Sequence, residues 1–131
     1  MPPELGEDLL SFWRERHLCA VTTLRRDGSP HVVPMGIVVD EVAGCAWGIT
    51  NRGSQKVRNI RAVDSPGAPV AVCQVDGRRW STLEGLAVVR DDEASVREAV
   101  QRYAERYRQP RENPDRVAVR ITLTRVLGNV R

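Results

Sequence analysis

Val-Ala-Val-Cys-Gln-Val-Asp-Gly-Arg-Arg-Trp-Ser-Thr-Leu-Glu-Gly-Leu-Ala-Val-Val, residues 70–89, is the stretch that decides the fold class. It places Asp76-Gly77 between two runs that are rich in β-branched and other apolar residues. An Asp-Gly pair between such runs is a strong signal for a tight β-hairpin turn. The stretch therefore predicts two antiparallel strands, Val70–Val75 and Arg78–Val89, with Gly85 as a β-bulge in the longer strand.

A second hairpin precedes this one in the chain. Strand-like sequence from Leu18 to Arg25 leads into the turn Arg26-Asp27-Gly28-Ser29, and a returning strand is predicted from Pro30 to Asp40. Pro34 cannot donate a backbone hydrogen bond, so this strand should lie at a sheet edge or carry a bulge. Two further strands are predicted at residues 45–50 and 117–123, and the second of them alternates apolar and polar residues. The predicted number of strands is therefore six.

Three helices are predicted around these strands. One follows Pro2-Pro3 and ends near His17, and another covers residues 55–62 with Ser54 as its N-cap. The last follows an acidic start at residues 91–93 and repeats apolar residues at helical spacing: Val96, Val100, Tyr103 and Tyr107. We therefore predict a single α+β domain over residues 1–131, in which a six-stranded antiparallel sheet forms a small β-barrel with flanking helices.

The composition excludes several classes of function. The 131 residues carry 20 basic and 17 acidic side chains, and this net charge of +3 is too balanced for a nucleic-acid-binding protein but compatible with an anionic ligand. No apolar stretch approaches the roughly 20 residues that span a bilayer, and the acidic N-terminus is not a signal peptide. Cys19, Cys45 and Cys73 form no C-x-x-C pair and lie in apolar runs, so we expect buried free thiols and a cytoplasmic protein.

The first candidate site is Ile-Thr-Asn-Arg-Gly-Ser-Gln-Lys-Val-Arg-Asn, residues 49–59. Here a strand end, a glycine-containing loop and a helix start follow one another, and free backbone N–H groups at such a place favour an anion. Ser54 adds a hydroxyl donor and Lys56 adds a positive charge, which together indicate phosphate binding. The spacing is not that of a Walker A loop. The local sequence supports an ordinary N-cap with a solvated lysine equally well.

The second candidate site is His-Val-Val-Pro-Met-Gly, residues 31–36. Pro34 removes a ladder donor and Gly36 leaves room above the strand, so a flat ring could approach the backbone there. The alternative is an edge strand without a binding role. His17 and His31 are the only histidines of the sequence, and neither lies in an H-E-x-x-H or G-x-S-x-G pattern, so no metal site or catalytic triad is expected.

The third candidate site is the hairpin of residues 74–85. In the predicted strand, Arg78, Trp80 and Thr82 share one face, and Arg79 and Ser81 share the other. A guanidinium beside an indole can hold a carboxylate of a flat conjugated ligand. The alternative, which this segment alone favours, is a half-exposed hairpin with a cross-strand aromatic.

A resemblance to a known family rests on ten short blocks of sequence. They are Glu15-Arg16-His17-Leu18, Thr22-Thr23-Leu24-Arg25, Ser29-Pro30-His31-Val32-Val33, Gly53-Ser54-Gln55-Lys56, Gln74-Val75-Asp76-Gly77, Arg79-Trp80, Leu83-Glu84-Gly85, Arg102-Tyr103-Ala104, Arg106-Tyr107-Arg108 and Arg125-Val126-Leu127-Gly128. In these blocks the chain resembles the deazaflavin-dependent branch of the pyridoxamine-phosphate-oxidase-like split β-barrels, and the likeness extends from Leu9 to Gly128. Within that branch it is most similar to the actinobacterial reductases of biliverdin.

The resemblance implies a split β-barrel homodimer with the cofactor in a groove between the subunits. FMN-using relatives carry an Arg and a Lys on the strand of residues 31–36, and the absence of both here favours coenzyme F420 over FMN. The resemblance implies these cofactor-binding residues: His31, Val32, Val33, Pro34, Met35, Thr50, Ser54, Gln55, Lys56, Asn59, Gln74 and Trp80.

The activity that follows from the resemblance is hydride transfer from reduced F420 to a conjugated small molecule, with biliverdin as the first candidate and bilirubin as its product. The cofactor would supply the redox chemistry, while the protein would supply orientation and charge. Arg78 and Arg79 are the expected anchors for the propionates of the substrate, and no side chain is identified as a general acid. The alternative functions are a non-catalytic carrier of F420, FMN or a tetrapyrrole and, less favoured by the missing Arg and Lys, an FMN-dependent oxidase.

Overall fold

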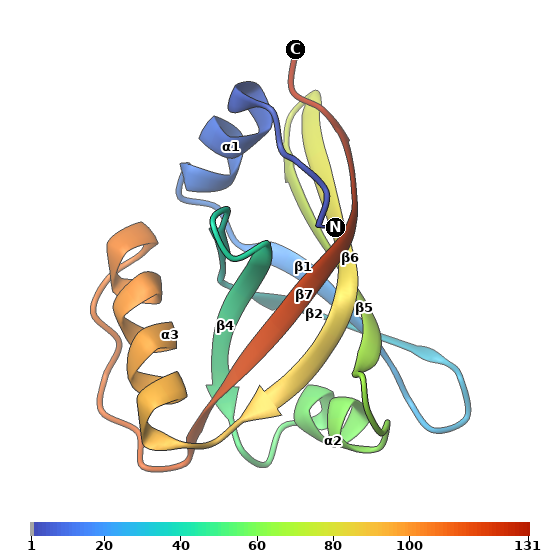
Figure 1. Ribbon diagram of the computed structural model, residues 1–131, viewed down its shortest axis with the longest axis vertical. Coiled ribbons are helices and arrows are strands. Elements are labelled where there is room, and N and C mark those ends of the chain that lie inside the picture. The colour runs from blue at the N-terminus through green and yellow to red at the C-terminus, as the bar shows by residue number, and fades with distance from the viewer. Residues whose placement is uncertain (1) are drawn as a thin grey trace.

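The computed structural model describes residues 2–131 as one seven-stranded antiparallel sheet with three helices (Figure 1). The α+β class is therefore confirmed. In chain order the elements are α1 (Glu7–Arg14), β1 (Cys19–Leu24), β2 (Pro30–Met35), β3 (Ile37–Asp40), β4 (Cys45–Asn51), α2 (Gln55–Arg61), β5 (Ala68–Asp76), β6 (Arg79–Arg90), α3 (Glu93–Arg106) and β7 (Arg116–Asn129).

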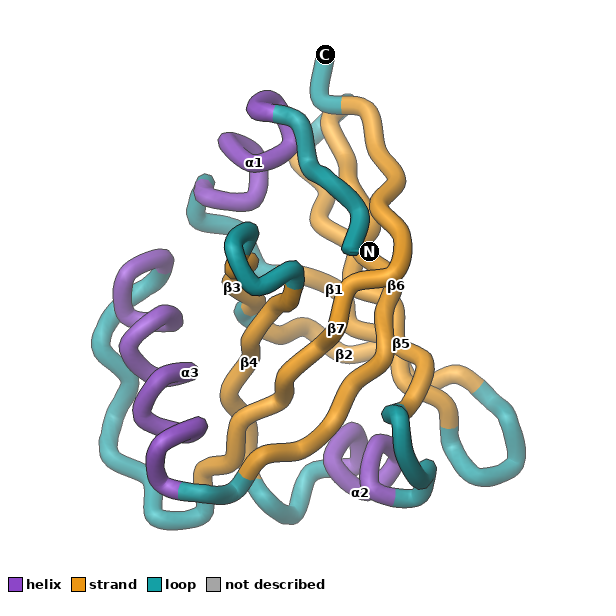
Figure 2. The backbone as a smooth tube through the Cα atoms, viewed as in Figure 1, coloured by secondary structure: helices purple, strands orange, loops and turns teal. Residues whose placement is uncertain are grey.

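The sheet order is β2-β1-β5-β6-β7-β4-β3, so β2 and β3 form its two edges (Figure 2). Only Gly36 separates these edges along the chain, which means that the sheet curls until its edges meet at this residue. Within residues 2–131 no ladder joins β2 to β3, and the sheet does not close into a barrel. The prediction of six strands was wrong, because the single strand expected over 30–40 is divided in two.

Gly36 divides this segment because two aromatic rings occupy the space above it. A Cβ atom at Gly36 would lie 2.8 Å from Cε2 of Tyr103 and 2.9 Å from Cε2 of Tyr107. The hydroxyl of Tyr107 donates to the carbonyl of His17 at 2.6 Å and accepts from the backbone N–H of Ile37 at 3.2 Å. The room that the sequence predicted above this glycine is therefore filled by the protein itself.

The two predicted hairpins are present. Gly28 and Gly77 adopt the left-handed φ values of +85° and +63° that tight turns require. In the second hairpin Asp76 pairs with Arg79, so Arg78 belongs to the turn and not to the strand. The ladder between β6 and β7 shifts register between Glu84 and Gly85, which confirms the predicted bulge.

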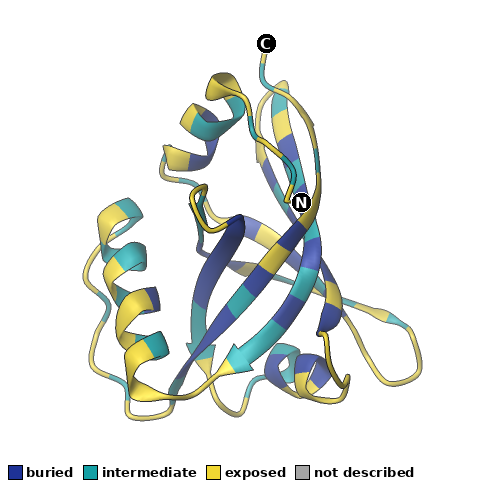
Figure 3. Cartoon of the chain, viewed as in Figure 1, coloured by how far each residue is buried: buried dark blue, intermediate teal, exposed yellow. Residues whose placement is uncertain are grey.

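The core lies inside the curled sheet, where buried and exposed residues alternate along the strands (Figure 3). Trp13 of α1 covers one end of this core, and its indole N–H donates to the hydroxyl of the fully buried Ser81 at 2.9 Å. Ile37, Val72, Leu83 and Ile121 are each at most 1% exposed. Burial of such side chains contributes about 1.5–3 kcal/mol each to folding.

The helices follow the predicted pattern and cover different parts of the sheet. Ser54 and Asp92 cap α2 and α3 by accepting from Val57 N and Ser95 N respectively. Helix α3 packs on β3, β4 and β7, while α2 packs on β1, β5 and β6 (Figure 1). No helix of residues 2–131 has the length and apolar character needed to cross a membrane.

Candidate functional site

The connection from β4 to α2 brings several predicted cofactor residues together. Thr50, near the end of β4, donates its hydroxyl to Ser54 Oγ at 3.5 Å, and Ser54 Oγ accepts from Val57 N at 3.4 Å. These side chains are half-buried. Helix α2 has only seven residues, so its dipole is weak and a bound anion would depend on side-chain charge.

Lys56 can supply that charge, and it is the only lysine of the sequence. The side chain is half-buried, and this desolvation lowers the pKa of its ammonium group. No carboxylate of the described residues lies within ion-pair distance of Lys56. A half-buried cation without a partner is stabilised when an anion binds beside it.

A buried chain of amides fixes the orientation of α2. The amide of Gln55 donates to Asn59 Oδ1 at 2.7 Å, and the amide of Asn59 donates to Thr23 Oγ1 of β1 at 2.9 Å. Asn59 is 4% exposed and Thr23 1% exposed. Asn59 therefore holds the helix that carries Lys56, and Gln55 is the member of the pair that a ligand could reach.

Strand β2 carries the second group of predicted residues along an edge that pairs only with β1. Val32 and Pro34 point outward, Val33 is half-buried on the opposite face, and Met35 is buried there. His31 lies on the same face as Val33, and its Nδ1 atom is buried without a hydrogen-bond partner among residues 2–131. A buried imidazole nitrogen without a partner is costly, and a ligand group at this position would remove that cost.

The outer face of β2, β1, β5, β6 and β7 is mainly apolar, apart from the pair of Glu84 and Arg125, and carries no helix. Cross-strand partners lie on one face of a sheet, so the pairs Thr22–Val32, Thr22–Ala71, Val75–Trp80 and Thr82–Leu127 place their side chains on this same side. We call this surface the outer face. Its most exposed apolar side chains are Leu24 (44%), Val32 (58%), Val75 (63%), Trp80 (38%) and Leu127 (41%).

Arg78 and Arg79, the two predicted substrate anchors, lie in different surroundings. Arg78 is exposed in the turn beside Val75 and Trp80, and no side chain of the described residues is bonded to it. Arg79 is turned toward α1, where its guanidinium donates to both oxygens of Glu15 at 2.7 and 2.8 Å and also contacts Asp76. Arg79 is thus already used inside the protein, whereas Arg78 is free to reach a ligand.

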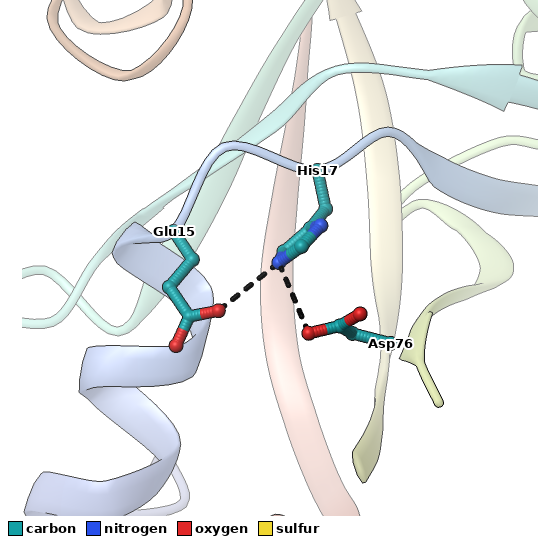
Figure 4. Close-up of side chains that lie close together, drawn as sticks. All are labelled: Glu15, His17 and Asp76. Atoms are coloured by element: carbon teal, nitrogen blue, oxygen red, sulfur yellow. Dashed lines mark hydrogen bonds and ion pairs between the residues drawn. The ribbon is translucent and has the colours of Figure 1, made fainter. Parts of the chain in front are cut away.

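Glu15, His17 and Asp76 form a cluster (Figure 4). The guanidinium of Arg79 contacts both of its carboxylates. His17 Nε2 lies 3.1 Å from Glu15 Oε1 and 3.9 Å from Asp76 Oδ2. The spacing would suit a metal ion, but each of the two carboxylates already forms an ion pair with Arg79. The cluster fastens the end of α1 to the β5–β6 hairpin.

The dependence of the protein's stability on acidic pH should involve Glu15. The hydrogen bonds from Arg79 and then from His17 lower the pKa of Glu15 to about 2. A carboxyl whose pKa falls on folding stabilises the fold above its ordinary pKa and loses this contribution as the pH drops through the folded value. We expect Glu15→Gln to lower the melting temperature at about pH 6 and to have little effect near pH 2. An equal effect of the substitution at both pH values would contradict this role.

Gln74, a predicted cofactor residue, is fully buried. Its amide N–H donates to the carbonyl of Phe12 at 2.8 Å, and its Oε1 accepts from Arg106. Arg106 also donates to the carbonyls of Glu15 and Ile37. The sequence did not single out Arg106 as a functional residue, although it joins α3 to three other parts of the chain and positions Gln74 beneath the surface.

A cavity of about 640 Å³ contains none of the predicted site residues. It lies between α1, the β3–β4 turn and α3, and four of its charged groups form two ion pairs. Arg14 lies 3.1 Å from Glu41, and Arg102 lies 2.9 Å from Asp40. A second cavity, of about 500 Å³, lies beside α2 and is lined in part by Gln55 and Asn59. Four arginines also line it, and the sequence did not indicate them as one site: Arg26, Arg52, Arg58 and Arg61.

Residues 5–129 match the family model described as pyridoxamine 5'-phosphate oxidase. This match covers nearly the whole described chain, including β2, the β4–α2 connection and the β5–β6 hairpin. The chain belongs to the pyridoxamine 5'-phosphate oxidase family. The family assignment made from the ten sequence blocks is thereby confirmed.

Among curated relatives within this oxidase family, the chain is similar to the F420H(2)-dependent biliverdin reductase of Mycobacterium tuberculosis (strain CDC 1551 / Oshkosh). The two are 50% identical over 125 residues, which cover 95% of this chain and 88% of the relative. This confirms the resemblance to the biliverdin reductases that the sequence indicated.

Several solved structures share the fold. A structure described as F420 reductase has a TM-score of 0.70 and 27% identity, and the match covers 95% of this chain and 98% of that chain. A conserved hypothetical protein of Mycobacterium tuberculosis has a TM-score of 0.78 and 25% identity, over 96% of this chain and 85% of that chain. A pyridoxamine 5'-phosphate oxidase-like protein of Listeria innocua, at 20% identity and a TM-score of 0.68, supports the fold alone; the match covers 93% of this chain and 96% of that chain.

Proposed function

We propose that this protein is an F420-dependent oxidoreductase that reduces biliverdin to bilirubin in the cytoplasm. The observation that carries the proposal is the 50% identity, over 95% of the chain, to the F420H(2)-dependent biliverdin reductase of Mycobacterium tuberculosis. The three cysteines are free, as expected for a reducing compartment.

The residues present fit an anionic deazaflavin. Among residues 2–131 the half-buried Lys56 has no carboxylate partner, and the half-buried hydroxyls of Thr50 and Ser54 precede it in the chain and are bonded to each other. His31 lies on the strand proposed to line the ring, and its buried Nδ1 has no hydrogen-bond partner within the described residues. Residues 31–36 carry no arginine or lysine, and this supports F420 over FMN.

When bound in its reduced form, F420 supplies the hydride, and the acceptor takes up one proton in addition. The protein supplies position and charge. Lys56, Ser54 and Thr50 would hold the cofactor phosphate, with Gln55 beside them and Asn59 keeping α2 in place through Thr23. His31 and the edge of β2, from Val32 to Met35, would contact the ring, because this edge has no strand beside it other than β1. Gln74 is fully buried, so it would support the site indirectly, through its hydrogen bonds to Phe12 and Arg106.

The acceptor would lie against Trp80, with Arg78 as its anchor. Biliverdin is flat and conjugated and carries two propionates, so it suits an exposed indole next to an unpaired guanidinium. Arg79 would act indirectly, because its bonds to Glu15 and Asp76 hold the hairpin that presents Arg78.

Arg78→Ala tests this assignment. A propionate anchor acts mainly in ground-state binding, so we expect KM for biliverdin to rise about 10-fold while kcat changes little. The readout is the loss of the red absorption of biliverdin with reduced F420 as donor. Arg97→Ala, which changes an exposed arginine of α3, is the matched control. An unchanged KM would exclude Arg78 as the anchor. If neither biliverdin nor another acceptor oxidises the reduced cofactor, the protein is a carrier.

We also propose a homodimer in which a second copy of the chain covers the outer face and leaves Trp80, near the start of β6, open to the acceptor. An uncovered apolar sheet face of this kind is typical of an interface, and the proposed cofactor edge β2 borders it. Light scattering should give twice the chain mass of 14.7 kDa. The double change Leu24→Glu and Val75→Glu should give a monomer and weaken F420 binding. Val42→Glu, at a 94% exposed turn residue away from this face, should leave the dimer intact. A wild-type monomer with full cofactor affinity would contradict the proposal.

A further inference from the structure

The end of α3 holds the two edges of the sheet where no ladder joins them. Within residues 2–131 no ladder connects β2 to β3, although Gly36 alone separates these strands in the chain. Ile37, the first residue of β3, is bonded to α3 instead. Arg106 donates to its carbonyl, and its backbone N–H donates to the hydroxyl of Tyr107 at 3.2 Å. Side chains at the end of this helix therefore fix the position at which β3 begins.

The hydroxyl of Tyr107 also holds the other side of this junction. It donates to the carbonyl of His17 at 2.6 Å, two residues before β1 begins. In β1, Cys19 pairs with Met35, which is the last residue of β2. One hydroxyl thus joins the chain entering β3 to the chain entering β1, and through β1 to the end of β2. Burial raises the pKa of Tyr107 to about 12, so the hydroxyl keeps the proton that it donates to His17 at neutral pH.

Two tyrosine rings pack against Gly36, and only one of them adds hydrogen bonds. The rings of Tyr103 and Tyr107 both lie against this glycine, with their centroids 4.9 Å apart. In the part of the chain that the structure describes, the hydroxyl of Tyr103 has no hydrogen-bond partner, whereas that of Tyr107 joins two segments. The hydrogen bonds of Tyr107 can therefore be removed without changing the packing of either ring.

We propose that Tyr107 is a positioning residue for hydride transfer, because its hydroxyl fixes the end of β2 and thereby the deazaflavin ring along that strand. This rests on the proposed function, in which His31 and the edge from Val32 to Met35 contact the ring. Biliverdin gains a hydride and one proton from water in that reaction, as the reduced cofactor is oxidised. A displacement of about 1 Å between reacting groups can cost about 100-fold in rate. The phosphate is assigned to Lys56 of α2, so Tyr107 should influence the hydride step more than cofactor affinity.

Tyr107→Phe tests the inference, because it removes the hydroxyl and keeps the ring. With reduced F420 as donor, kcat for biliverdin should fall about 10-fold, while KM and the F420 dissociation constant stay within about 2-fold of the wild type. The isotope effect with reduced F420 that carries deuterium at the transferred position should rise, because the hydride step then limits the rate more strongly. Tyr103→Phe is the matched control and should keep the wild-type values of all four quantities.

Hydrogen–deuterium exchange provides a readout in the cofactor-free protein. The amide of Ile37 loses its acceptor in Tyr107→Phe, so it should exchange about 5-fold faster than in the wild type or in Tyr103→Phe. A thermal melt of each variant sets the temperature at which all of them are fully folded, and every rate is measured below it.

Equal kcat in Tyr107→Phe and Tyr103→Phe would overturn the inference, and so would a loss of activity that is explained by weaker F420 binding. Wild-type exchange at Ile37 would show that the hydroxyl does not hold the junction. A Tyr107→Phe variant that does not fold would make the hydroxyl a requirement of the fold, which also contradicts a positioning role. Failure of the proposed function gives a different result. Neither the wild type nor Tyr103→Phe would then reduce biliverdin, and the inference would fall with the function although the exchange at Ile37 still differed.

Discussion

Replacing Lys56 with alanine is expected to weaken F420 binding by about 10- to 100-fold. A charge-assisted hydrogen bond to a phosphate contributes about 1.5–3 kcal/mol, and Lys56 is the one cation at the β4–α2 connection that is both half-buried and unpaired among residues 2–131. Its pKa is lowered by desolvation, so removing it relieves a burial cost and should leave the melting temperature nearly unchanged. Fluorescence titration and a thermal melt measure the two quantities.

The single lysine offers a second readout for the same claim. An amine-selective reagent can modify only Lys56 and the N-terminal amine, because the sequence has one lysine and its other 19 basic residues are arginines. Bound F420 should protect Lys56 from modification, and mass analysis of the peptide that contains it would report this. Lys56→Arg, which keeps the charge, should retain more affinity than Lys56→Ala. Unchanged affinity in Lys56→Ala together with absent protection would place the phosphate elsewhere.

Replacing Arg106 with alanine is expected to destabilise the fold by about 3 kcal/mol or more, with a fall in melting temperature of roughly 10 °C. The guanidinium donates to the carbonyl of Glu15 at 2.6 and 2.9 Å and to Ile37 O and Gln74 Oε1. It also lies 5.6 Å from the ring centroid of Trp13. Alanine would leave three acceptors without this donor, and each such loss costs about 1–3 kcal/mol when the group is buried.

Two variants sharpen the Arg106 experiment. Arg97→Ala removes an arginine from the same helix. Its only partner among residues 2–131 is the exposed Glu93, so the substitution should change the melting temperature by little. Arg106→Lys keeps the charge but cannot reach all three acceptors, so its stability should fall between those of the wild type and the alanine variant. If Arg106→Ala melted like Arg97→Ala, the network would not hold α3 to α1 and β5.

The elements that sequence predicts well here are those determined by neighbouring residues. The Asp-Gly turns at Gly28 and Gly77, the Gly85 bulge and the cap at Ser54 all follow from local backbone requirements, and all are present. The break at Gly36 was missed because its cause lies about 70 residues away, in the rings of α3 and the residue after it. No local pattern distinguishes a glycine that leaves room for a ligand from one that leaves room for the chain.

In the candidate site, too, the sequence predicts the local features but not the contacts between distant segments. The sequence placed Ser54 and Lys56 on a loop-to-helix connection, and the structure has them there. Spacing could not indicate that Gln74 is buried or that Arg79 pairs with Glu15, because these contacts join segments 60 or more residues apart. The cavity beside α2 was missed for the same reason, since Arg26 and Arg52 become neighbours of Arg58 only when the sheet and α2 are assembled.

The most direct test of the account is the initial rate of biliverdin bleaching by the purified protein with equal concentrations of three donors: reduced F420, reduced FMN and NADPH. Binding through β2 and the β4–α2 connection, without an Arg and Lys pair on residues 31–36, predicts rapid reduction with reduced F420. It predicts little or none with reduced FMN, and none with NADPH, because the chain has no G-x-G-x-x-G strand-to-helix unit. Reduction that is as fast with FMN or NADPH, or absent with reduced F420, would contradict the account.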